Sequence, residues 1–243
     1  MTEVSKNARI AGALYILASA VGFVGLIYVP GRFIVHGNAA TTASNIAQHE
    51  LLFRWGILSY LVGGVLWLFV PLALYRMLKG VDQTLAVLMV ILGSLMQVPA
   101  YMVNTAIDAV VVILVRGADF LSVFDKPQRE ALAMVFLQVH GRLDTVNLIW
   151  AGLWLLPFGV LVYKSRLLPR FLGAWLIVAG FAWLAITFTG LLLPDHQSKV
   201  FEFAQPFTLG EVVVMLWLVI MGAKEPRVMV MAEVNAVAIR TGD

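Results

Sequence analysis

The stretch LAVLMVILGSLMQVPAYMVNTAIDAVVVILV, from Leu85 to Val115, decides the fold class of this chain. Its only charged side chain is Asp108, and it lacks the alternation of apolar and polar residues that strands of a membrane barrel show. A helix crosses a hydrocarbon core about 30 Å thick with roughly 20 residues. Because a helix satisfies its own backbone hydrogen bonds in lipid, the stretch predicts a membrane-spanning helix.

Composition extends this interpretation to all 243 residues. Hydrophobic residues make up 61% of the sequence and charged residues only 13%, which leaves too few polar side chains to cover a soluble globule. Six apolar stretches are long enough to span a membrane, with approximate bounds 10–29, 55–78, 85–115, 131–163, 171–193 and 207–222. The sequence therefore predicts an all-α polytopic bundle in residues 1–223 and a short cytoplasmic tail in residues 224–243.

The third and fourth of these spans are unusually long. As straight helices they would measure about 46 and 50 Å, more than the hydrocarbon core, so we expect an extended hairpin. Pro99 should kink the third span, and Pro71 and Pro157 should kink the second and fourth. In the loop between the first two spans, cap-forming residues from Thr41 onward predict a short helix.

Basic residues indicate the orientation of the bundle. Ten Lys and Arg residues fall on the side of the two termini and six on the other side. Because positive residues favour the cytoplasmic side, we expect both termini in the cytoplasm and a multi-pass location in the inner (plasma) membrane. Ala18-Ser19-Ala20 resembles a signal-peptidase site. The apolar run continues to Val29, however, which favours an uncleaved first span.

Polar side chains within the third span are the first indication of function. Gln97, Asn104 and Asp108 are seven and four residues apart, which places all three on one helical face. A charged residue at the centre of a membrane helix costs at least about 2.5–3.5 kcal/mol. That face is therefore expected to point into the bundle.

The neighbouring fourth span repeats this pattern. His140, Asp144 and Asn147 are spaced by four and three residues, and Arg142 lies roughly opposite His140 around the helix. Glu211, early in the sixth span, is expected at the same outer level. We therefore expect an outward-facing hydrated cavity between spans three, four and six. Its candidate binding residues are Asn104, Asp108, His140, Arg142, Asp144, Asn147 and Glu211.

These residues permit two interpretations. In the first, the acidic residues and His140 bind a cation, a proton or a polar head group, and Arg142 holds an anion or a carboxylate. In the second, Asp108 or Glu211 pairs with Arg142 and His140 pairs with Asp144, so that the polar groups merely neutralise one another.

The sequence favours no catalytic or metal chemistry. The absence of cysteine excludes disulfides, thiolate ligands and thiol nucleophiles in this chain, and neither an HExxH nor a GxSxG motif occurs. All four histidines fall toward the outer side, which suggests metal binding or pH sensing, but His140 with Asp144 supplies only two ligands. We expect no metal, no cofactor and no nucleic-acid partner. The expected partners are the lipid bilayer and a small solute or ion.

Several short stretches, taken in order, carry a resemblance to a known family. They are Arg9-Ile-Ala-Gly-Ala-Leu-Tyr-Ile, Ala43-Ser-Asn45-Ile, Glu50-Leu-Leu-Phe53-Arg54-Trp-Gly56, Leu74-Tyr75-Arg76 and Leu168-Pro169-Arg170-Phe-Leu-Gly173. The chain up to about Lys224 resembles a bacterial integral-membrane family of uncharacterised proteins, domain of unknown function 4386. The resemblance implies a helical membrane protein of this size and brings no substrate, cofactor or catalytic residue.

Three functions remain open at this point. The leading hypothesis is a non-enzymatic membrane protein that binds or transports a small polar or amphipathic solute through the outer cavity. The first alternative is a membrane-embedded hydrolase or lipid-modifying enzyme that uses His140 and Asp144. The second is a structural or sensory partner protein. The sequence does not define the oligomeric state.

Overall fold

A computed structural model of the chain describes residues 3–224, and within them every regular element is a helix. In chain order the elements are α1 (Glu3–Phe23), η1 (Val24–Tyr28), α2 (Val29–Phe33), α3 (Ala39–Gln48), α4 (Glu50–Leu78), α5 (Gln83–Val90), η2 (Ile91–Leu95), α6 (Val98–Arg116), η3 (Asp119–Leu121), α7 (Lys126–Ser165), α8 (Arg170–Leu192), η4 (Pro194–His196) and α9 (Gln197–Ile220). The predicted tail, apart from its first residue, lies outside the described residues.

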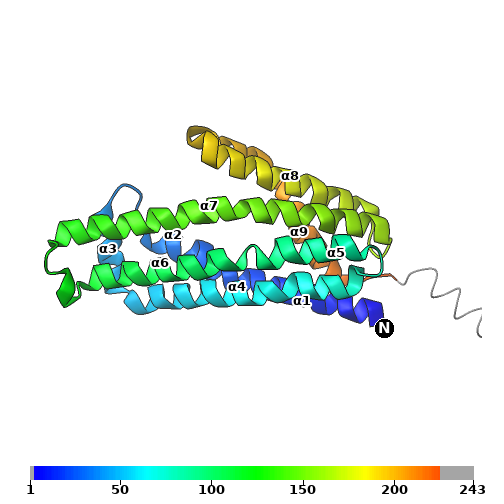
Figure 1. The fold of residues 1–243 in the computed structure, drawn as a ribbon, viewed down its shortest axis with the longest axis horizontal. Helices are drawn as coiled ribbons and strands as arrows, with labels where there is room; N and C mark the ends of the chain where they lie inside the picture. The colour runs from blue at the N-terminus through cyan, green and yellow to red at the C-terminus, as the bar shows by residue number, and fades with distance from the viewer. Residues whose placement is uncertain (1–2, 225–243) are drawn as a thin grey trace, which may run out of the picture.

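Six helical rods are long and apolar enough to cross a membrane, which confirms the predicted all-α polytopic bundle. They are Glu3–Phe33, Glu50–Leu78, Gln83–Arg116, Lys126–Ser165, Arg170–Leu192 and Pro194–Ile220. The rods of α1, α4, α5–α6 and α7 run side by side along the long axis, while the α8–α9 hairpin leans away from α7 at one end (Figure 1). The protein is thus a multi-pass membrane protein whose surroundings are a lipid bilayer.

The sixth rod begins earlier than the hydropathy pattern indicated. The pattern suggested a start near residue 207, whereas α9 begins at Gln197 and continues through Pro206. Lys199 and Glu202 lower the hydropathy of the intervening segment. They do not interrupt the backbone hydrogen bonds on which a helix depends, so hydropathy placed the start too late.

Prolines have different effects in the three central rods. In the third rod a five-residue π-helix, η2, and a turn at Met96 and Gln97 separate α5 from α6, and Pro99 occupies the first turn of α6. Proline is tolerated at that position because the first amides of a helix have no intrahelical acceptor. Pro71 and Pro157 instead lie inside the continuous helices α4 and α7.

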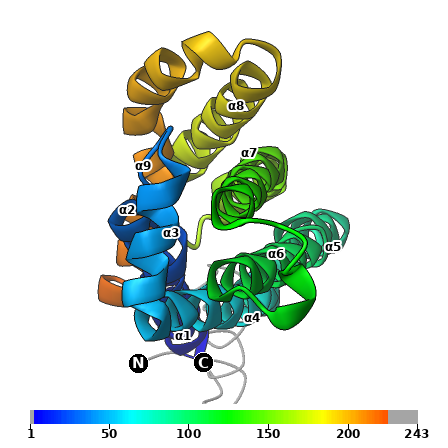
Figure 2. The ribbon, with the colours of Figure 1, turned by 90° about the vertical axis from the view of Figure 1, so that its left-hand side faces the viewer.

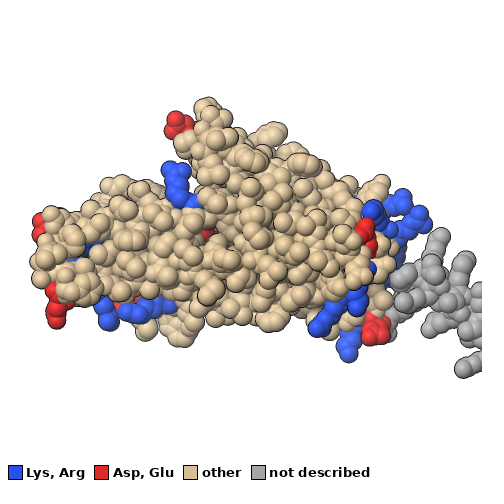
Figure 3. Space-filling view, in the orientation of Figure 1, with Lys and Arg blue, Asp and Glu red and all other residues tan. Residues whose placement is uncertain are grey.

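Exposed basic residues mark two layers across the bundle. We call the end that carries the start of α1 the proximal end and the opposite end the distal end. Arg54 on α4 and Arg142 on α7 mark the distal layer, and Arg76 on α4 and Lys164 on α7 mark the proximal layer. On each helix the two residues are 22 residues apart, which corresponds to about 33 Å of helix. This spacing matches the thickness of a hydrocarbon core. Charged groups gather toward the two ends of the molecule, with a broad uncharged region between them (Figure 3).

The bundle continues beyond the distal layer as the predicted extended hairpin. α7 has 40 residues, about 60 Å, and its first 16 residues precede Arg142. Here the ends of α6 and α7 pack with α3 over a separate hydrophobic core, the distal core, formed by Val29, Phe33, Ile46, Phe53, Val111, Val112, Leu114, Leu121, Ala133 and Leu137. The short helix α3 agrees with the helix predicted in this loop. Figure 2, which looks onto the distal end, shows α3 across the ends of the rods.

Glycines bring α7 and α8 into close contact in the proximal half. A Cβ atom on Gly159 would lie 2.7 Å from the carbonyl oxygen of Gly173, and one on Gly152 would lie 2.8 Å from that of Gly180. Both pairs are spaced by seven residues on antiparallel helices, so the two backbones meet along one continuous line. Membrane helices use such small residues for close van der Waals packing.

We therefore predict that Gly159→Ala destabilises the protein by about 1–3 kcal/mol, because the added methyl group would overlap the backbone of α8. Thermal unfolding in one detergent measures the effect. The matched control is Gly141→Ala on the same helix, where a Cβ would meet nothing within 4 Å. Equal destabilisation by both substitutions would contradict the close-packing argument.

Asp82 joins two rods at the proximal end. Its Oδ1 accepts a hydrogen bond of 3.1 Å from the backbone N–H of Leu85 and so caps α5, and its Oδ2 lies 3.5 Å from Nζ of Lys164 on α7. The hydrogen bond from Leu85 and the nearby charge of Lys164 lower the pKa of this carboxyl. A lowered pKa means that the carboxylate stabilises the fold above the pKa of the unfolded chain and loses this effect as the pH falls through the folded value.

We predict that Asp82→Ala lowers the melting temperature by a constant amount between pH 5 and pH 8. The difference from the wild type should shrink below about pH 4, where the aspartate becomes protonated. A pH series of thermal unfolding curves tests this. A difference that grew toward low pH would contradict the direction of the pKa shift.

Candidate functional site

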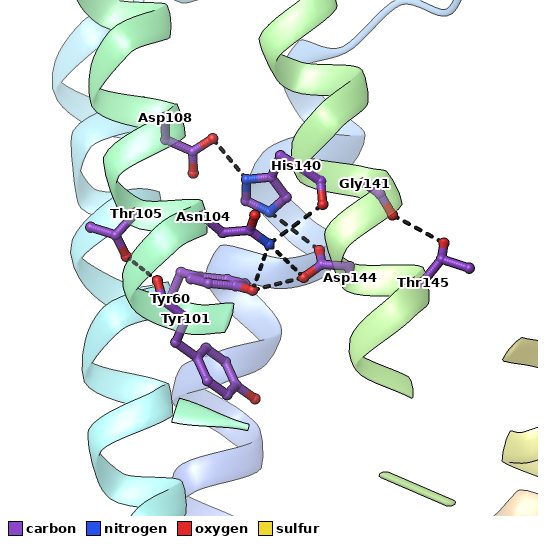
Figure 4. A network of polar contacts seen from close by, with 9 residues as sticks. All are labelled: Tyr60, Tyr101, Asn104, Thr105, Asp108, His140, Gly141, Asp144 and Thr145. Atoms are coloured by element: carbon purple, nitrogen blue, oxygen red, sulfur yellow. Dashed lines mark hydrogen bonds and ion pairs between the residues drawn. The ribbon is translucent and has the colours of Figure 1, made fainter. Parts of the chain in front are cut away.

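His140 lies between two carboxylates at the contact of α6 and α7 (Figure 4). Its Nδ1 is 2.9 Å from Oδ1 of Asp108 on α6. Its Nε2 is 3.2 Å from Oδ2 of Asp144, one turn along α7, an ion-pair distance without the alignment of a hydrogen bond. The side chains of His140 and Asp108 are each 10% exposed and that of Asp144 is 25% exposed. The three groups therefore form a largely buried acid–imidazole–acid cluster.

Two further side chains hold Asp144 from the other side. The hydroxyl of Tyr60, on α4, donates a hydrogen bond of 2.7 Å to Oδ1 of Asp144, and the amide of Asn104 donates one of 2.8 Å to the same oxygen. The Asn104 amide also lies 3.1 Å from the Tyr60 hydroxyl. Both side chains are buried. Three helices are thus joined through one carboxylate.

The local backbone explains why these groups meet. Asn104 and Asp108 are four residues apart on α6, as are His140 and Asp144 on α7, so each pair occupies one helical face. The first rod approaches α4 closely, because a Cβ on Gly25 would lie 2.5 Å from the backbone nitrogen of Tyr60. Gly25 belongs to the π-helix η1, a rare helix type that often occurs at functional sites.

A cavity of about 160 Å³ adjoins the cluster. It lies between the first rod, α4, α6 and α7 and is lined by Gly25, Leu26, Val29, Pro30, Ile34, Phe53, Gly56, Ile57, Asp108, Leu137, His140, Gly141 and Asp144. At about 30 Å³ per molecule it has room for roughly five waters. One wall carries the cluster and the others are apolar.

The structure brings together four of the seven candidate residues and leaves three elsewhere. Asn104, Asp108, His140 and Asp144 meet. Arg142 is exposed and forms no ion pair within residues 3–224, and Asn147 makes no side-chain hydrogen bond there. The arginine therefore does not neutralise the cluster.

Glu211 belongs to a different part of the bundle. Its carboxylate accepts a hydrogen bond from the hydroxyl of Tyr15 on α1. The hydroxyl of Ser59, the neighbour of Tyr60 on α4, donates a hydrogen bond to the backbone carbonyl of Val21, so Val21 marks the level of the cluster on α1. Tyr15 lies six residues, about 9 Å, closer to the proximal end than Val21. The observed cavity accordingly lies between spans one to four, whereas the expected one was between spans three, four and six.

Tyr60 is the member of the cluster that sequence reasoning missed. A single tyrosine in an apolar span is usually interpreted as packing or as part of an interfacial belt. The available signal was its position near the middle of the second span, between the small residues Gly56 and Gly63. Gly56 and Gly63 lie against the first rod and Gly64 lies against Tyr101 of α6, so other helices pack closely on α4 around Tyr60.

The geometry does not form a metal site. Within the described part of the chain no group of three His, Asp or Glu side chains could hold a metal ion. The two ring nitrogens of His140 point in different directions and each faces a different carboxylate, so the three side chains do not converge on one point.

The fold and the cluster together define a polytopic integral membrane protein with a buried acidic cluster beside a cavity. The chain belongs to the family described as Domain of unknown function (DUF4386), which matches residues 10–222. No curated protein and no solved structure matches the chain. The family agrees with the resemblance seen in the sequence and carries no assigned activity.

We predict that Tyr60→Phe destabilises the protein by about 1–3 kcal/mol, because Asp144 would lose one of its two donors in a buried setting. Thermal unfolding tests this against Tyr163→Phe. The Tyr163 side chain is exposed, and its hydroxyl has no hydrogen-bond partner in residues 3–224. If both variants unfolded at the wild-type temperature, the hydroxyl of Tyr60 would have no structural role.

Proposed function

We propose that this protein binds a small cationic solute, such as an organic amine, in the cavity beside Asp108, His140 and Asp144. The observation that carries the proposal is the excess of negative charge at the cavity. With a protonated imidazole the cluster carries a charge of about −1, and with a neutral imidazole about −2. No lysine or arginine lines the cavity.

The apolar walls limit the kind of cation. A fully hydrated inorganic ion would gain nothing from contact with Phe53, Ile57 and Leu137, whereas the carbon atoms of an organic amine would. The volume of about 160 Å³ limits the ligand to a few non-hydrogen atoms. Pockets for small ligands typically combine such apolar walls with a few polar groups that fix the orientation.

The position of the site along the bundle supports entry of the solute from the distal side. Asp144 is two residues from Arg142, which belongs to the distal basic layer, so the cluster lies near the distal surface of the bilayer. On the proximal side the rings of Tyr60 and Tyr101 pack with their centroids 5.0 Å apart, and Tyr101 lies against Gly64. Transport through the protein would require these rings to separate, which makes binding the first step to test.

The hydrolase alternative receives less support from this geometry. A general base needs a ring nitrogen within reach of a water or a substrate. Both nitrogens of His140 already face carboxylates. The partner-protein alternative is tested separately by the mass of the purified protein, since a stable complex with itself or another chain would raise it.

We predict that ethanolamine raises the melting temperature of the purified protein, whereas ethylene glycol, a neutral compound of similar size, does not. A ligand at 100 times its Kd adds about 2.7 kcal/mol of stability. Asp108→Asn should reduce the shift at least severalfold, because it removes a negative charge from the cavity wall without touching the bonds of Tyr60 or Asn104.

The control for this experiment is Asp195→Asn, which changes an exposed carboxyl in η4 away from the cavity. It should leave the ethanolamine shift unchanged. Equal shifts with ethanolamine and ethylene glycol, or a full shift in Asp108→Asn, would rule out amine binding at this site.

A further inference from the structure

A second cavity, of about 540 Å³, lies on the other side of the contact between α4 and α6. Its lining is Arg54, Ile57, Leu58, Leu61, Thr105, Ala109, Val112, Ile113, Arg116 and Ala118. We call it the α4–α6 groove. Ile57 is shared with the smaller cavity, so the two spaces are neighbours separated by this side chain and by α6.

One end of the groove carries two arginines fixed by one carboxylate. Nε of Arg54 lies 2.6 Å from Oε1 of Glu50, and Nε of Arg116 lies 2.8 Å from Oε2 of the same residue. Glu50 thus engages each guanidinium through a single nitrogen and leaves the terminal nitrogens as further donors. The net charge of the three groups is about +1, and the arginine side chains are 48% and 63% exposed.

The rest of the groove is almost entirely apolar. On α4 it extends from Arg54 to Leu61, about 10 Å, and on α6 from Arg116 to Thr105, about 16 Å. Leu58 and Ile113 are 45% and 42% exposed along this length. The groove is therefore a long apolar channel on the surface with a positive group at its distal end.

The position of the groove in the bilayer identifies its occupant. Arg54 lies about 33 Å along α4 from Arg76, so the arginines are at the level of lipid phosphates and the apolar part faces the acyl chains of the same leaflet. Guanidinium groups bind phosphate through two parallel hydrogen bonds. We propose that the α4–α6 groove binds an anionic phospholipid of the distal leaflet, with its phosphate on Arg54 and Arg116 and one acyl chain between α4 and α6.

Preorganisation distinguishes this groove from ordinary contact with surrounding lipid. A free arginine side chain loses conformational entropy when it binds phosphate, whereas Glu50 already holds both guanidinium groups near each other. The single excess positive charge favours a lipid with a net negative charge over a zwitterionic one. This proposal does not rest on the amine site, since it uses none of Asp108, His140 and Asp144.

The test uses the full chain, purified in detergent and depleted of lipid. Dioleoyl phosphatidylglycerol or dioleoyl phosphatidylcholine is added, and native mass spectrometry measures the bound lipid. We expect at least threefold more phosphatidylglycerol than phosphatidylcholine on the wild type. The double substitution Arg54→Gln with Arg116→Gln should remove this preference. Arg32→Gln, which changes an exposed arginine of α2 outside the groove, should keep it.

A second variant guards against misfolding of the double substitution. Ala109→Trp fills the groove from an exposed position and leaves both arginines in place, and it should reduce bound phosphatidylglycerol at least threefold. Equal binding of the two lipids to the wild type, or wild-type binding by the double variant, would overturn the proposal. It would also be overturned if glycerol 3-phosphate, which has no acyl chain, raised the melting temperature as much as phosphatidylglycerol, because the site would then be a phosphate site only.

Discussion

The placement of His140 between Asp108 and Asp144 is the interaction on which the distal half of the molecule depends. A charged side chain left unpaired beside lipid costs several kcal/mol, so these groups must face one another. Their pairing fixes the rotation of α6 against α7, and the bonds of Asp144 to Tyr60 and Asn104 extend the constraint to α4. Rotation of any one of the three helices alone would separate these partners.

The proximal half is held by a different kind of contact. There α7 and α8 meet through glycines, and the largest core cluster, which includes Trp154 and Phe158, packs behind them. Close backbone contact and aromatic packing characterise this half. The distal half, in which side chains of four rods surround charged groups, retains a cavity. Both candidate sites thus lie in the half that carries the polar contacts.

The two proposed sites have opposite charges and lie on opposite sides of one helix contact. The acidic cavity is inside the bundle and is lined by residues of the first rod, α4, α6 and α7. The basic groove lies between α4 and α6, with Arg54 and Arg116 at one end and mostly apolar side chains along its length. Ile57 lines both spaces.

The sequence by itself determined the number of spans, the long central hairpin and the faces of the third and fourth spans that carry polar groups. These follow from hydropathy and from the 3.6-residue period, which are properties of single helices. Only the tertiary structure decided which faces meet. Glu211 bonds to Tyr15 because α9 packs against α1, and Tyr60 joins the cluster because α4 packs against α6 and α7. Periodicity gives the direction in which a side chain points from the axis of its own helix. The partner that this side chain meets depends on packing between segments far apart in the chain.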